Sequence, residues 1–217
     1  MRKKLFTVIG LGRFGASVAR TLSGLGHDVL VIDKDAERIR NIADEVTHAV
    51  EGDATDDHTL RAIGIRNFDV VIVAIGQDIQ ASILTALNVK DLGVGRVIAK
   101  AQNHQHGKVL SKIGVDEVIY PERDMGARVA HRLASANVLD ILELAPNYSV
   151  VEIAASERMH GKSLRQLDLR VRFGVNVIAV QHEGKLNISP KADDAIVKGD
   201  VLTVMGRNED LQRLEGF

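Results

Sequence analysis

A glycine-rich loop near the start of the chain is the sequence feature best suited to binding a ligand. Gly10, Gly12 and Gly15 follow a short apolar run and open a segment with helical spacing. In such a loop the first glycine permits a tight turn, the second lets a phosphate approach the backbone, and the third lets helix and strand pack closely. Free amide groups at the positive end of the helix dipole would bind the phosphates. The loop therefore predicts an adenine-nucleotide site.

An acidic residue in the expected place strengthens this prediction. Asp33 lies 18 residues past Gly15, at the expected end of the second strand. Its carboxylate is placed to accept hydrogen bonds from a ribose with free hydroxyls and to repel a 2′-phosphate. A glycine loop alone is a weak signal, but with its strand, its helix and this acid it favours a bound nucleotide over a turn without a ligand.

The residues inside and beside the loop bear on which nucleotide binds. The guanidinium of Arg13 could bind phosphate oxygens in a bidentate way. A dinucleotide places two phosphates at the loop, whereas ATP adds a third that favours a cation. The alternative is a solvent-exposed arginine on the first helical turn. Phe14 follows Arg13, and Lys34 follows Asp33, so we expect both in the same site.

Two further turns and one lysine complete the predicted site. The segments 52–55 and 74–76 follow the third and fourth expected strands, at the edge of the sheet where open α/β folds bind ligands. The contacts expected from these turns are Asp53, Ala54, Ala74 and Ile75, with Asp53 and the Ile75 backbone toward the adenine. Thr55 is expected to cap the next helix. Lys100 follows the fifth strand, and the sequence favours neither of two alternatives for it: contact with a phosphate or exposure to solvent.

The first 120 residues alternate between strand-like and helix-like patterns. The expected strands are 5–9, 29–32, 47–50, 70–74, 96–99 and 117–120, and the expected helices are 14–25, 36–43, 60–63, 79–92 and 105–113. Strand and helix alternating at this pace predict stacked βαβ units. The fold class is therefore α/β, with a doubly wound Rossmann parallel sheet over residues 1–121.

The pattern changes after Pro121. Residues 122–144 read as one long helix, within a crossover and dimerisation segment over 122–146. Residues 138–144 are apolar over much of the helix surface, which favours contact with a second subunit over packing within the chain. Ala145, Pro146 and Asn147 break this helix and mark a domain boundary. A small α+β domain then spans 147–217, with expected strands at 149–154, 176–182, 185–188 and 201–205 and a helix at 163–172.

Composition excludes several classes of function. The 217 residues are 45% hydrophobic and 26% charged, contain no cysteine and carry a formal net charge of −1. Disulfides, thiolate catalysis and cysteine-based zinc sites are thereby excluded, and no basic field predicts a nucleic-acid partner. No apolar run approaches the roughly 20 residues of a membrane-spanning helix, so a cytoplasmic protein is expected. His104 and His106 are expected to be solvated rather than metal ligands.

Taken together, these motifs resemble the regulator-of-potassium-conductance (RCK, or KTN) family. The segments that carry the resemblance are the GLGRFG loop, Asp33, the GDAT turn, residues 121–126 and residues 198–206. The chain is most similar to the regulatory subunits of Ktr-type potassium uptake systems, and the resemblance covers its whole length. It implies dimers assembled into an octameric ring, peripheral at the inner face of the cell membrane through a membrane potassium-transporting subunit.

The resemblance also implies a set of ligands. ATP would favour the conducting state and ADP the inactive one, with NAD(H) as a competitor. Arg13 would meet the terminal phosphate, and Glu122 would hold Mg²⁺ or Na⁺ shared with that phosphate; from the residues alone, Glu122 is a helix-start acid. Some family members bind cyclic di-AMP, and the matching positions here are Arg170, Asn176, Val177 and Pro190, which are otherwise surface and strand-edge residues.

We therefore expect a nucleotide-gated regulatory subunit that is not an enzyme. The alternative is an NAD-dependent oxidoreductase. Hydride transfer needs a positioned proton donor in a second domain over the cofactor. The small second domain and the lack of an evident acid–base pair in the sequence weigh against this alternative.

Overall fold

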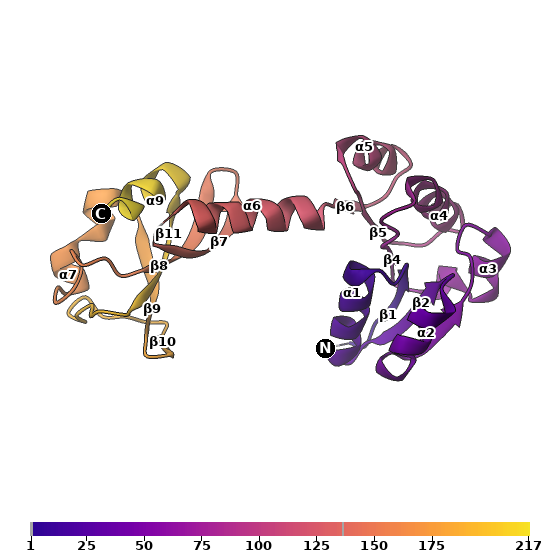
Figure 1. Cartoon of the computed structure of the whole chain (residues 1–217), viewed down its shortest axis with the longest axis horizontal. Helices are drawn as coiled ribbons and strands as arrows, with labels where there is room; N and C mark the ends of the chain where they lie inside the picture. Colours follow the sequence, from indigo (N-terminus) through magenta and orange to yellow (C-terminus); the bar gives the residue numbers. More distant parts are fainter. Residues whose placement is uncertain (1, 136) are drawn as a thin grey trace. The chain divides into compact units, whose positions relative to one another are not determined.

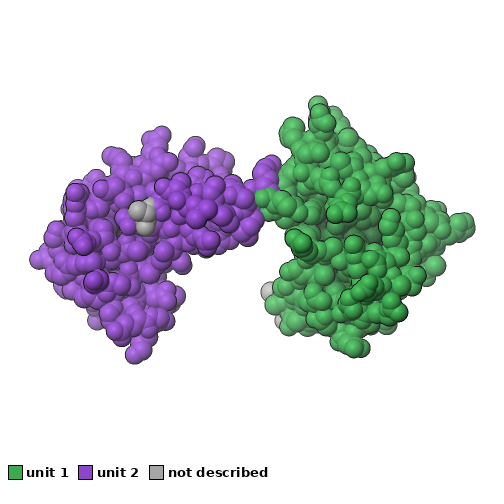
Figure 2. Space-filling model, viewed as in Figure 1, with its two compact units in different colours: residues 1–122 green, residues 123–217 purple. Residues whose placement is uncertain are grey.

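The computed structural model describes residues 2–135 and 137–217. It divides the chain into two compact units, Met1–Glu122 and Arg123–Phe217, and the division falls within helix α6, Pro121–Ala134 (Figures 1 and 2). Each unit has its own buried apolar core, two clusters in the first and one in the second.

The first unit is built on a parallel six-stranded sheet. Its strands are β1 Leu5–Ile9, β2 Asp28–Asp33, β3 His48–Glu51, β4 Val70–Val73, β5 Val97–Lys100 and β6 Glu117–Ile119. They lie in the order β3-β2-β1-β4-β5-β6, and every neighbouring pair is parallel. The order reverses between β1 and β4, the point where open α/β sheets bind ligands.

Helices cover both faces of this sheet. They are α1 Arg13–Gly24, α2 Ala36–Ile42, α3 Asp57–Ala62, α4 Ile79–Asp91 and α5 His104–Lys112. Side chains alternate between the faces along each strand, so Val8 packs in the cluster with α1 and α2 while Ile9 packs in the cluster with α3, α4 and α5. The predicted doubly wound sheet is confirmed.

Aspartate side chains begin three of these helices. Asp35, Asp56 and Asp78 accept hydrogen bonds from backbone N–H groups in the first turns of α2, α3 and α4. The prediction that Thr55 caps α3 is wrong. Its hydroxyl instead donates to Asp53 at 2.7 Å, which leaves the cap to Asp56. Such caps are worth about 1 kcal/mol each.

The second unit carries an antiparallel five-stranded sheet in the order β10-β9-β11-β8-β7. The strands are β7 Val138–Ala145, β8 Tyr148–Ala154, β9 Asn176–His182, β10 Lys185–Asn187 and β11 Val201–Arg207. The short helices α7 Leu164–Leu167 and α8 Leu169–Phe173 and the last helix α9 Asn208–Glu215 complete the unit. The predicted helix over 163–172 is therefore interrupted, because Asp168 adopts a left-handed conformation with φ 43°.

The predicted helix over residues 122–144 is wrong in its second half. Helix α6 ends at Ala134, and β7 follows as an edge strand that pairs with β8. Leu and Glu favour helix locally, but pairing with a partner strand overrides that preference. Asn147, with φ 69°, forms the hairpin turn between β7 and β8. The break at 145–147 therefore lies inside the second unit.

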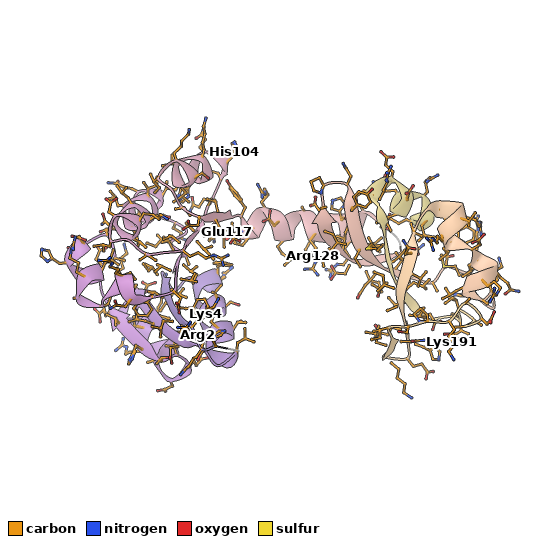
Figure 3. All side chains as sticks on the ribbon, turned by 180° about the vertical axis from the view of Figure 1, so that it is seen from behind. Arg2, Lys4, His104, Glu117, Arg128 and Lys191 are labelled. Carbon is orange, nitrogen blue, oxygen red and sulfur yellow. The ribbon has the colours of Figure 1, made fainter. Side chains whose placement is uncertain are left out.

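Helix α6 is attached to β7 by a paired arginine and aspartate. Arg128 (labelled in Figure 3) donates through Nε to Asp140 Oδ1 at 2.6 Å and through Nη2 to Asp140 Oδ2. Both side chains remain partly exposed. Within the described residues, no helix is long and apolar enough to cross a membrane.

Candidate functional site

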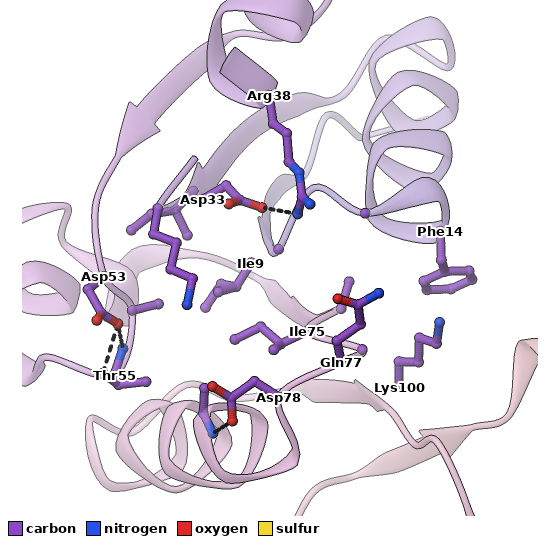
Figure 4. Close-up of a pocket in the computed structure, with 18 of the residues that line it drawn as sticks. Ile9, Phe14, Asp33, Arg38, Asp53, Thr55, Ile75, Gln77, Asp78 and Lys100 are labelled. Atoms are coloured by element: carbon purple, nitrogen blue, oxygen red, sulfur yellow. Dashed lines mark hydrogen bonds and ion pairs between the residues drawn. The ribbon is translucent and has the colours of Figure 1, made fainter. Parts of the chain in front are cut away.

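A cleft of about 1120 Å³ lies at the carboxyl edge of the parallel sheet, in the first unit (Figure 4). The predicted site residues that line it are Gly10, Gly12, Arg13, Phe14, Asp33, Lys34, Asp53, Ala54, Ala74, Ile75, Lys100 and Glu122. Gly15 is buried behind the loop and does not line it. The fold thus gathers residues from the ends of five strands and the starts of α1 and α6 around one space.

The three glycines of the loop are constrained for different reasons. Gly10 has φ 95°, and a Cβ there would lie 3.0 Å from the backbone nitrogen of Ile75. A Cβ on Gly15 would lie 1.9 Å from the carbonyl oxygen of Gly10. A Cβ on Gly12, in contrast, would meet no protein atom within 4 Å. The fold requires the first and third glycines, whereas the second leaves open space where a ligand would approach.

The start of α1 is suited to an anion. Gly12 occupies the position before the first helical residue, and no side chain caps the helix there. The first amide groups of a helix lack partners within the helix and attract phosphate through hydrogen bonds and the dipole. Arg13 is exposed on the first turn and lines the cleft.

Asp33 serves the loop as well as the cleft. Its Oδ2 accepts from the backbone N–H of Leu11 at 2.5 Å, and its Oδ1 accepts from Asp35 N–H at 2.9 Å. Arg38, on the first turns of α2, lies 3.6 Å from Asp33 Oδ2 (Figure 4). Arg38 was not predicted from the sequence as a site residue. Its position in the helix that directly follows Asp33 could have indicated it. Its charge offsets that of Asp33, so this end of the cleft is less negative than the carboxylate alone predicted.

Asp53 is held as a charged acceptor at another edge of the cleft. Thr55 donates to Asp53 Oδ1 through its backbone N–H at 2.9 Å and through its hydroxyl at 2.7 Å. The backbone bond, and then the side-chain bond, hold the pKa of Asp53 below its ordinary value. Ala54 and Ala74 are buried and contribute apolar surface to the lining of the cleft.

Lys100 and Glu122 form an ion pair in the wall of the cleft. Lys100 Nζ donates to Glu122 Oε1, and this hydrogen bond lowers the pKa of Glu122. The lysine side chain is 11% exposed and the glutamate side chain 70% exposed. The reading of Lys100 as simply solvated is therefore wrong. Glu122 is the second residue of α6, as a helix-start acid would be.

His106 differs from the sequence expectation. His104 is exposed, but His106 is only 2% exposed. Its Nδ1 accepts from the backbone N–H of Gln102 at 3.3 Å, and burial lowers its pKa. The prediction of a solvated residue is wrong for His106, because α5 begins at His104 and turns His106 toward the core.

The positions matched to a cyclic di-AMP site lie in the second unit. Arg170 is exposed on α8, and Asn176 and Val177 begin β9. Pro190 follows β10, which pairs with the opposite end of β9. The structure thus brings Arg170, Asn176 and Val177 to one end of β9, and it leaves Pro190 outside the regular elements.

Comparison with known proteins assigns the family. The chain matches the TrkA-N domain over residues 6–121 and the TrkA-C domain over residues 148–217. It is 49% identical to Ktr system potassium uptake protein C of Bacillus subtilis (strain 168), over 98% of this chain and 96% of the relative. The chain belongs to the Ktr/Trk potassium uptake family. A second Ktr relative, Ktr system potassium uptake protein A of the same organism, is 44% identical over 99% of this chain and 97% of its own length.

Solved structures share the fold of this Ktr-family chain. The GsuK RCK domain aligns with a TM-score of 0.70 at 19% identity, over 99% of this chain and 47% of that chain. A GsuK channel bound to NAD aligns with a TM-score of 0.69 at 20% identity, over 99% of this chain and 39% of that chain. The predicted RCK fold is confirmed.

Proposed function

We propose that this Ktr-family chain is the nucleotide-sensing regulatory subunit of a potassium uptake system. The observation that carries the proposal is the cleft at the sheet edge, where Gly12 leaves the start of α1 open and Asp33 lies at the end of β2. Phosphates would bind the amides of α1, and the ribose would face Asp33. The subunit itself performs no chemistry.

ATP and ADP are the nucleotides we assign to the cleft. Arg13 would bind the terminal phosphate, so ATP would favour the conducting state and ADP the inactive one. NAD(H) would compete, since the related fold of GsuK has been solved with NAD and with ADP. A charge-assisted hydrogen bond to phosphate is worth roughly 1.5–3 kcal/mol, enough to separate the two adenine nucleotides.

A Mg²⁺ or Na⁺ ion would accompany the terminal phosphate at Glu122. Among the described residues, no group of three or more His, Cys, Asp or Glu side chains could hold a metal. Mg²⁺ commonly binds one or two carboxylates together with substrate phosphates and water. Glu122 fits that pattern as a single carboxylate, and the ion would reduce its repulsion of the phosphate.

Self-assembly and a membrane partner are part of the proposal. Apolar side chains are exposed on α6 and on the edge strand β7. Leu133 on α6 is 76% exposed, and Leu142 and Leu144 on β7 are 58% and 53% exposed. Exposed apolar patches of this kind mark contact with another chain. Dimers through this surface would build the octameric ring, which would act on the transporter subunit at the cytoplasmic face of the membrane.

Cyclic di-AMP binding by the second unit stays a prediction. Arg170 is exposed and could bind a phosphate, and Asn176 is exposed at the start of β9 and could bind a base edge. Titration of the full chain with cyclic di-AMP, with Arg170→Ala as the comparison, tests this site. An affinity that the substitution leaves unchanged would remove Arg170 from it.

A competition titration with ATP, ADP and NADH, combined with potassium flux, tests the main proposal. We expect all three nucleotides to displace one another. With the cognate transporter in liposomes, flux should be higher with ATP than with ADP. Equal flux with both nucleotides would contradict the sensor. Oxidation of NADH in the presence of a metabolite would instead support the alternative, an NAD-dependent oxidoreductase.

A further inference from the structure

The Lys100–Glu122 pair contains the least exposed cationic side chain of the cleft. Four cationic side chains line this cleft: Arg13, Lys34, Arg38 and Lys100. The first three are exposed, whereas the side chain of Lys100 is 11% exposed. An ammonium group so far removed from water interacts more strongly with a neighbouring anion than an exposed one does. Of these four cations, Lys100 should therefore have the strongest electrostatic interaction with the anion that it binds.

The surroundings of Lys100 place it near the start of α1. Its Nζ lies 5.8 Å from the centre of the Phe14 ring, on the first turn of that helix (Figure 4). The Lys100 Nζ also lies 3.4 Å from the point where a Cβ on Gly76 would stand, in the turn that follows β4. Lys100 lines the same cleft as Gly12 and Arg13 at the start of α1. With the inner phosphates on the amides of α1, a third phosphate would lie farther along this cleft, where Lys100 is an available cation.

Glu122 links this ammonium group to the boundary between the two units. It is the last residue of the first unit and the second residue of α6. Its carboxylate accepts the hydrogen bond from Lys100 Nζ and remains largely exposed to solvent. A terminal phosphate that reached Lys100 would meet this carboxylate as a competing anion. Both anions cannot keep the same ammonium group without repelling each other.

We propose that Lys100 exchanges Glu122 for the terminal phosphate of a nucleoside triphosphate. This exchange rests on the proposed nucleotide site and assigns Lys100 as a second residue, besides Arg13, that distinguishes three phosphates from two. In the nucleotide-free and diphosphate states Lys100 holds Glu122. The third phosphate takes over the ammonium group and releases the carboxylate at the first turn of α6, where the chain passes from one unit to the other.

Binding of ATP and ADP in EDTA, without divalent cations, tests the exchange. Lys100→Met keeps the stem beside Phe14 and removes the charge, so ATP affinity should fall about tenfold or more while ADP affinity changes less than twofold. Lys34→Met removes a charge at the other side of the cleft and should weaken ATP and ADP equally. Thermal melting of each variant checks that the fold is retained.

The glutamate variant gives an independent test with the opposite sign. Glu122→Gln keeps the shape of an exposed side chain but frees Lys100 and removes the repulsion. ATP affinity in EDTA should therefore rise severalfold, and ADP affinity should stay the same. Were Glu122 only a cation ligand, the substitution would leave metal-free ATP binding unchanged.

The outcomes separate the two proposals. Wild-type protein that binds neither nucleotide refutes the nucleotide site and the exchange with it. If the wild type binds both nucleotides, two results refute the exchange alone. One is an equal loss of affinity for ATP and ADP in Lys100→Met, and the other is an unchanged ATP affinity in Glu122→Gln. If Lys100→Met does not fold, Glu122→Gln still decides, since its side chain is 70% exposed.

Discussion

Substitution of Gly12 by alanine should weaken nucleotide binding while sparing the fold. Gly12 has φ −65° and ψ 180°, which any residue adopts, and a Cβ there would meet no protein atom within 4 Å. The remaining cost is that of alanine at a helix-capping position, no more than about 1 kcal/mol. In a chain of this size such a change lowers Tm by about 2–4 °C.

The effect on binding should be larger. The added methyl group would occupy the space through which a phosphate approaches the amides of α1. We expect a loss of at least tenfold in affinity for ATP and ADP alike, equivalent to about 1.4 kcal/mol. Isothermal titration calorimetry measures the affinity, and differential scanning calorimetry measures the stability of the same preparation.

Gly15→Ala is the matched control. Its Cβ would lie 1.9 Å from the carbonyl oxygen of Gly10, a backbone atom that cannot turn aside as a side chain does. Overpacking of this kind costs about 1–3 kcal/mol or more, so Gly15→Ala should lose stability and binding together. If Gly12→Ala binds nucleotide like the wild type, or melts as early as Gly15→Ala, the reasoning about the loop is refuted.

Three further predictions concern the rest of the chain. Arg13→Ala should weaken ATP by roughly 1.5–3 kcal/mol and ADP by less; equal losses in calorimetry would show that Arg13 contacts only the inner phosphates. Burial lowers the pKa of His106 from 6.5, so its contribution to stability is present above that pH and is lost as pH falls through the lower, folded-state value. Denaturation between pH 7 and pH 5 should therefore show a steeper loss of stability for the wild type than for His106→Gln, and matching slopes would contradict this. Light scattering should find at least a dimer at micromolar concentration. Leu142→Arg should weaken dimerisation without unfolding the second unit. A wild-type monomer would contradict the proposed self-assembly.

The sequence by itself determined the fold of the first unit and was enough to predict a ligand class for it. Short valine- and isoleucine-rich runs specify buried parallel strands, because consecutive apolar side chains point to opposite faces of a strand. Both sets are buried only in a sheet that is covered on both faces. The glycine loop and Asp33 are local features as well, since their roles follow from the turn, the helix start and the strand end that adjoin them. β1 was predicted as the structure has it, Leu5–Ile9, and β2 to within one residue at each end.

Only the tertiary structure decided the features that depend on distant partners. Residues 138–145 have the composition of a helix and become a strand because β8 pairs with them. Lys100 and Glu122 are 22 residues apart and meet because β5 and β6 are neighbours, with Lys100 opposite Ile119. His106 is buried because α5 turns it inward. Periodicity along a chain encodes which face of an element is apolar, whereas strand pairing and register determine which charges come together.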